Sequence, residues 1–96
     1  MIKHVVLIKL KPETSPEQIN RMIAGYNSMR DAIPDLLSWS MGPNLRNDGD
    51  YEYAMVAIVE DAESLRRYVD HPLHKQVARE LGRPIFATRE IADYEF

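Results

Sequence analysis

The side chains best suited to chemistry gather in one stretch, residues 68–74, which reads Tyr-Val-Asp-His-Pro-Leu-His. This stretch holds a phenol and two of the three histidines of the chain. A neutral imidazole titrates near physiological pH, so a histidine directed into a cavity is suited to act as a general base. His74 is the best candidate, because it starts an apolar stripe at helical spacing that continues with Val77 and Ala78.

Each of these side chains also has a purely structural interpretation. His74 follows Pro72 closely, so its ring nitrogens can instead tie the helix junction together by hydrogen bonds to the backbone. Tyr68 lies on the inner face of the predicted preceding helix, where packing alone would account for it. His71 directly precedes Pro72, and we expect it to cap a helix or to lie at the surface.

The third histidine, His4, shares a strand face with Val6 and Ile8. It either orients a ligand in the same cavity as His74 or is a core residue with a satisfied hydrogen bond, and an apolar strand face favours the core residue. No cysteine and no inward carboxylate completes a metal-ligand set with the three histidines. We therefore expect no metal ion and no other cofactor.

The first half of the chain predicts two strands that flank a helix. Residues 2–10 alternate with the period of two that is typical of a strand. Ser15-Pro16 marks a helix start, and the helix is expected to stop near Ala32 because Pro34 disfavours helical geometry in the residue before it. Residues 36–41 predict the second strand.

The second half predicts a third strand over residues 51–59 and then a broken helix. The first helical segment covers residues 62–70, and Pro72 cannot continue it but suits the first turn of a new one. The new segment ends at Gly82. Residues 85–96 contain the last strand.

The order β-α-β-β-α-β predicts an α+β, ferredoxin-like fold with an antiparallel four-stranded sheet in one domain, residues 1–96. Two helices cover only one face of such a sheet, yet residues 2–10 and 51–59 are apolar on both faces. The second face needs a partner, and the same face of a second copy buries both at once. We therefore expect a homodimer through the sheet face, a dimeric α+β barrel.

The composition excludes several partners. The net charge is −3, which argues against nucleic acid because that affinity needs clustered cations. No apolar run approaches the roughly 18 residues of a membrane span, and the first residues lead directly into a strand pattern, so we expect a cytoplasmic protein that does not bind membranes.

The chain resembles the stress-responsive A/B barrel (Dabb) domain family. The matching residues lie in order along almost the whole sequence: Lys3 to Pro12, Ile33-Pro34, Gly42, Val59-Glu60-Asp61, Tyr68, His71 to His74, and Asp93-Tyr94. The resemblance implies the same dimeric α+β barrel that the two apolar faces predict.

The resemblance also implies a possible reaction. In one branch of the family, the plant cyclases that form olivetolic acid, a histidine and a tyrosine at the positions of His74 and Tyr68 perform a metal-free aldol cyclisation with thioester cleavage. By this resemblance His74 removes an acidic proton between two carbonyls, and the Tyr68 hydroxyl donates to the oxygen of the enolate. Residues 83–86 depart from that branch where it supplies pocket-wall groups, so the resemblance does not fix the substrate.

The sequence leaves three alternative functions. The first is a polyketide-cyclase-like lyase acting on a small β-dicarbonyl or polyketide-like compound. The second is a non-catalytic stress-response dimer that binds a small apolar ligand, and the third is a dimerisation module alone. Arg89 is expected at an exposed edge; if it faces the pocket, it favours an anionic ligand such as a carboxylate. Trp39 belongs either to the core or to the interface. The residues predicted to contact a ligand are His4, Val6, Ile8, Met22, Tyr26 and Val77.

Overall fold

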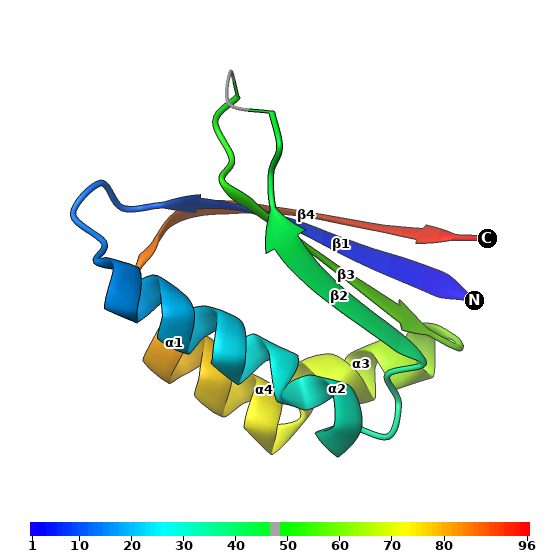
Figure 1. Ribbon diagram of the computed structural model, residues 1–96. Coiled ribbons are helices and arrows are strands. Elements are labelled where there is room, and N and C mark those ends of the chain that lie inside the picture. The colour runs from blue at the N-terminus through cyan, green and yellow to red at the C-terminus, as the bar shows by residue number, and fades with distance from the viewer. Residues whose placement is uncertain (47–48) are drawn as a thin grey trace.

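The computed structural model describes residues 1–46 and 49–96, and its elements follow the predicted β-α-β-β-α-β order, with each of the two predicted helices divided into shorter pieces (Figure 1). The sheet is antiparallel throughout, with the strand order β2-β3-β1-β4. The ferredoxin-like fold is therefore confirmed. The elements are β1 (Ile2–Leu10), α1 (Pro16–Asn27), α2 (Met29–Ala32), β2 (Ser38–Pro43), β3 (Tyr53–Val59), α3 (Ala62–Asp70), α4 (Pro72–Val77), a π-helical turn η1 (Ala78–Gly82) and β4 (Phe86–Glu95).

All the helices lie on one face of the sheet (Figure 1). On β1 the buried side chains are those of one parity, which includes His4 and Ile8, and they face the helices. The other parity, which includes Val5 and Leu7, lies on the face without helices, where Leu7 is 36% exposed. None of the described helices is long and apolar enough to cross a membrane.

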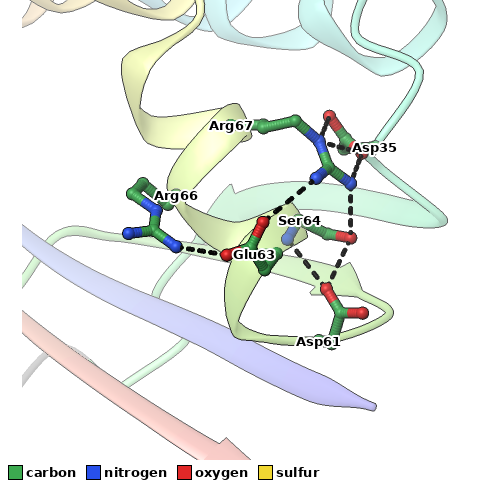
Figure 2. Close-up of polar contacts among 6 residues, drawn as sticks. All are labelled: Asp35, Asp61, Glu63, Ser64, Arg66 and Arg67. Carbon is green, nitrogen blue, oxygen red and sulfur yellow. Dashed lines mark hydrogen bonds and ion pairs between the residues drawn. The ribbon is translucent and has the colours of Figure 1, made fainter.

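Side-chain caps fix where the helices begin. Ser15 and Gln18 form a capping box at the start of α1. Asp61 accepts hydrogen bonds from the backbone N–H and the hydroxyl of Ser64 at the start of α3, at 2.8 and 2.9 Å (Figure 2). Arg67 then anchors α3 to the segment before β2 through Asp35, with a shortest distance of 2.9 Å (Figure 2).

The structure corrects three predicted boundaries. The third strand, predicted from residue 51, begins at Tyr53. The predicted strand over residues 36–41 lies instead at Ser38–Pro43, because the Leu36 N–H bonds the Ile33 carbonyl in a turn and edge strand β2 tolerates a proline at its end. The first helix reaches Ala32 as predicted but is interrupted at Ser28, whose hydroxyl donates to the Gly25 carbonyl at 2.6 Å.

The turn η1 is a feature that the sequence did not predict. The Arg83 N–H donates to the Ala78 carbonyl at 2.8 Å, one residue further back than in an α-helix. This wider turn brings Gly82 against two aromatic side chains. A β-carbon at Gly82 would lie 2.5 Å from the Tyr26 hydroxyl oxygen and 2.9 Å from the Phe86 ring.

We expect Gly82→Ala to destabilise the fold. Overpacking costs about 1–3 kcal/mol, and this exceeds the gain of up to about 1 kcal/mol that alanine has over glycine in a helix. The net loss in unfolding free energy should be about 1 kcal/mol in a denaturant titration. Gly42→Ala is the matched control, because a β-carbon there meets no atom within 4 Å. Equal effects of the two substitutions would contradict this packing.

Candidate functional site

A small cavity, called here the inner cavity, has a volume of about 110 Å³ and lies where the helix-facing side of the sheet meets α3 and α4. Strand β1 contributes His4 and Val6, and α1 contributes Tyr26. The predicted pair, Tyr68 from α3 and His74 from α4, lies on the same wall. Sequence and structure therefore bring the chemistry-bearing side chains to one place.

The Tyr68 and His74 rings contact each other across the helix break. Their centroids are 4.8 Å apart in an edge-on arrangement, and the His4 ring lies 5.8 Å from that of Tyr68 on another side. Three polar rings thus surround the inner cavity. A reacting group held there would be within reach of more than one of them.

One ring nitrogen of His74 is used by the backbone. Nδ1 lies 3.0 Å from the Val69 carbonyl oxygen, which can only accept, so Nδ1 carries the proton of the neutral ring. Nε2 is then an unprotonated acceptor, and it has no hydrogen-bond partner within the described part of the chain. The structural interpretation of His74 thus accounts for only one of its two nitrogens.

The Tyr68 hydroxyl is also without a partner. Tyr68 is only 2% exposed, and its side chain makes no hydrogen bond within residues 1–46 and 49–96. No side-chain nitrogen or oxygen of these residues is sealed from solvent and unbonded, so the hydroxyl must open into the cavity. The same holds for Tyr26, which is 3% exposed. Two phenol O–H groups are therefore available to a ligand.

Burial sets the protonation of these groups. It raises the pKa of Tyr68 well above its usual value and that of Tyr26 to about 12, although Arg89 and Arg83 act in the opposite direction on Tyr26. Burial also lowers the pKa of His74; the Val69 hydrogen bond opposes this, and the nearby charge of Arg89 adds to it. At neutral pH the site holds an unprotonated imidazole beside two O–H donors.

His4 has a partner that the sequence analysis did not identify. Asp93 Oδ1 lies 2.5 Å from His4 Nδ1, and the two residues are directly paired across β1 and β4. His4 therefore has the satisfied hydrogen bond of the core interpretation, and it also lines the inner cavity. Only the strand register brings these side chains together, since they are 89 residues apart.

The remaining predicted ligand contacts divide into two groups. Val6 and Tyr26 line the inner cavity with His4. The other three belong to the hydrophobic core and do not line the inner cavity, so their contact with a ligand stays a prediction. They are Ile8, Met22 and Val77.

Three other side chains now have defined places. His71 caps α4 by accepting a hydrogen bond from the Leu73 N–H at 3.1 Å, so its predicted capping role is confirmed. Trp39 belongs to the core: it is 5% exposed and donates to Asn27 Oδ1 at 3.0 Å. Arg89 is exposed, as expected, but it also lines the inner cavity.

A second and larger hollow, called here the outer cavity, adjoins the first. Its volume is about 380 Å³, and it shares Tyr26, Phe86 and Arg89 with the inner cavity. Arg83 and Thr88 add polar groups to its wall. No three histidine, aspartate or glutamate side chains in the described ranges are grouped as a metal site.

Comparison with known proteins identifies the family. The model of the stress-responsive A/B barrel domain (Dabb) matches residues 2–96. The chain is a Dabb domain. A Streptomyces coelicolor protein described as uncharacterized is 39% identical to this Dabb domain over 100 aligned positions, which cover all of both chains.

Solved structures show the same fold. A dimeric ferredoxin-like protein of unknown function from Thermobifida fusca superposes with a TM-score of 0.89 at 27% identity, over 99% of this Dabb domain and 90% of the other chain. The hydroxynitrile lyase of Passiflora edulis superposes with a TM-score of 0.85 at 21% identity, over 97% and 90%. At that identity the likeness to the lyase shows the fold alone.

The lowered pKa of His74 predicts a specific pH dependence of stability. In the unfolded chain the imidazole has its ordinary pKa near 6.5, so below that pH the unfolded chain binds a proton before the folded one does. The stability contributed by the neutral ring is complete above about 6.5 and is lost as the pH falls through the folded pKa.

We therefore expect the unfolding free energy to fall more steeply below pH 6.5 in the wild type than in His74→Gln, whose amide can still donate to the Val69 carbonyl. Denaturant titrations at a series of pH values and one protein concentration measure this difference. Parallel profiles would show that His74 titrates alike in the folded and unfolded chains.

Proposed function

We propose that this Dabb domain is an enzyme that abstracts a proton from a small β-dicarbonyl or polyketide-like compound and promotes its cyclisation. His74 Nε2 takes the proton from the carbon between two carbonyls, and the electron pair moves into one carbonyl to form an enolate. The Tyr68 O–H donates to the enolate oxygen. The enolate carbon then attacks another carbonyl of the same molecule, and the imidazolium returns the proton to the new alkoxide.

The observation that carries this proposal is the pairing of an unbonded imidazole nitrogen with the unbonded hydroxyl of a buried tyrosine at one cavity. The polar groups of buried side chains usually have a hydrogen-bond partner within the protein. Here the helix junction already uses Nδ1 of His74, yet Nε2 and the Tyr68 hydroxyl stay free. A substrate carbonyl oxygen can accept the hydrogen bond that the Tyr68 hydroxyl does not make within the protein. An acidic C–H of the same substrate can give its proton to Nε2.

The protonation states support the same reaction. A base must be unprotonated before it acts, and the lowered pKa of His74 keeps it so at neutral pH. The raised pKa of Tyr68 keeps its proton in place for donation. The Passiflora neighbour is a hydroxynitrile lyase, so this fold accommodates enzyme catalysis.

The second candidate is a non-catalytic protein that holds a small apolar ligand. Val6, Met55 and Ile91 give the inner cavity apolar walls, which favours this function. The two functions differ in the effect of replacing His74. An enzyme would lose turnover, whereas a binding protein would retain its ligand and would have no turnover to lose.

We infer that two copies of the chain pack through the sheet face without helices. Val5, Leu7, Val56 and Ile58 lie together on adjacent strands of that face. A contiguous apolar surface of this kind marks an interaction site, and a second copy covers it symmetrically. The Thermobifida relative is a dimer.

The proposed reaction is tested by deuterium exchange. Ethyl acetoacetate in D₂O exchanges the protons between its carbonyls slowly at low buffer concentration, and we expect the wild type to accelerate this exchange. His74→Ala should lose about 10²-fold or more of the acceleration, because general-base catalysis contributes at least that much. Tyr68→Phe should lose about 10²-fold, as other enzymes do without one oxyanion donor. Proton NMR follows the C2 signal.

Two controls separate catalysis from folding. His71→Asn keeps an acceptor at the cap of α4, and Tyr94→Phe removes a hydroxyl from an exposed residue. Both should exchange at the wild-type rate. If wild type and His74→Ala exchange alike while folded, the base assignment is wrong.

The dimer is tested by charge insertion. Leu7→Asp places a carboxylate in the centre of the apolar face, and we expect light scattering to report a monomer near 11.1 kDa, half the mass of the wild-type dimer. Leu45→Asp is the control, because Leu45 is 93% exposed. A monomeric wild type would refute the sheet-face dimer.

A further inference from the structure

The outer cavity contains two arginines that no carboxylate neutralises. Arg83 follows η1, and Arg89 lies on the helix-facing side of β4, paired with Ile8. Neither makes an ion pair within the described part of the chain, whereas Arg66 and Arg67 both do. The residues lining the two cavities include no aspartate or glutamate.

A third donor points to the same place. Tyr26 is a buried residue that borders both cavities, and its hydroxyl lies against Gly82 and has no hydrogen-bond partner among the described residues. Arg89 and Arg83 are both close enough to lower its pKa against the effect of burial. Two guanidinium groups and one phenol O–H therefore surround a single hollow as donors.

The sizes of the cavities indicate how they are used. About 110 Å³ is well below the roughly 300–1,000 Å³ of typical ligand pockets, whereas about 380 Å³ lies within that range. A substrate that reacts in the inner cavity must therefore extend into the outer one. Tyr26, Phe86 and Arg89 form the wall that the two cavities share, so the part of the substrate in the outer cavity lies close to the reacting carbon.

We propose that Arg83, Arg89 and Tyr26 bind the carboxylate of the substrate, which is therefore an anionic β-keto compound with its reactive carbon beside Tyr68 and His74. This inference rests on the proposed function for the position of the reacting carbon. The planar fork of arginine matches the two oxygens of a carboxylate, and two arginines can share them. Inorganic phosphate also accepts hydrogen bonds from arginine and tyrosine, so it is included in the test below.

The test compares two molecules of nearly equal shape, acetoacetate and the neutral acetoacetamide. Each compound, and inorganic phosphate, is titrated into the protein and binding is followed in ¹H–¹⁵N spectra. The proteins are the wild type, Arg83→Gln, Arg89→Gln, Arg89→Lys and Arg66→Gln. We expect acetoacetate to bind about tenfold or more tightly than acetoacetamide, and each arginine-to-glutamine change in the cavity to weaken acetoacetate about tenfold. Arg89→Lys should retain part of the affinity, and added salt should reduce the preference.

Arg66→Gln is the matched control, because it removes one positive charge from a surface ion pair with Glu63 and lines neither cavity. It should bind acetoacetate as the wild type does, and thermal unfolding checks that every variant is folded. Equal binding of the two molecules, no binding of either, or wild-type affinity in the folded Arg83 and Arg89 variants would each overturn the carboxylate site. Arginine-dependent binding of inorganic phosphate without binding of acetoacetate would do so too.

Deuterium exchange at C2 in the same samples separates this inference from the proposed function. Arginine-dependent binding of acetoacetate without exchange would refute the reaction and leave the anion site standing. Exchange of acetoacetate and acetoacetamide at equal rates, unchanged in the arginine variants, would support the reaction and refute the anion site.

Discussion

The candidate site depends on one broken hydrogen bond in the helical layer. In a continuous helix the Leu73 N–H would bond the Val69 carbonyl four residues before it. Pro72 disrupts the helix at this point, and two histidines take the separated partners: His71 Nδ1 accepts from Leu73, and His74 Nδ1 donates to Val69. Residues six apart in a continuous helix point roughly 120° away from each other. The break instead brings the Tyr68 and His74 rings to 4.8 Å.

This arrangement unites the structural and the catalytic interpretations of His74. The bond to Val69 selects the tautomer and fixes the ring, so that the remaining nitrogen has its lone pair available. A hydrogen bond to a second group commonly orients a catalytic histidine in this way. His4 is held similarly by Asp93, at 2.5 Å. Burial then keeps His74 neutral and both tyrosines protonated, so the same packing that closes the core prepares the proposed chemistry.

The sequence predicted the fold well because its signals are local. Pro16 and Pro72 start helices, and the period-two pattern of residues 2–10 identifies a central strand. The pairing of His4 with Asp93 depends instead on register between the two ends of the chain, which no local pattern specifies. The turn η1 has no sequence signal beyond Gly82, yet it places Arg83 at the outer cavity. Arg89 has the right strand parity, but only the position of the helices shows that the cavity lies beside it.

The central claim is that His74 presents an unprotonated Nε2 to the cavity because Nδ1 is bonded to Val69. Long-range ¹H–¹⁵N NMR of the histidine rings measures the protonation of each nitrogen directly. At neutral pH the structure predicts a neutral His74 ring with the proton on Nδ1 and none on Nε2. A proton on Nε2, in the other neutral tautomer or in an imidazolium, would contradict the account.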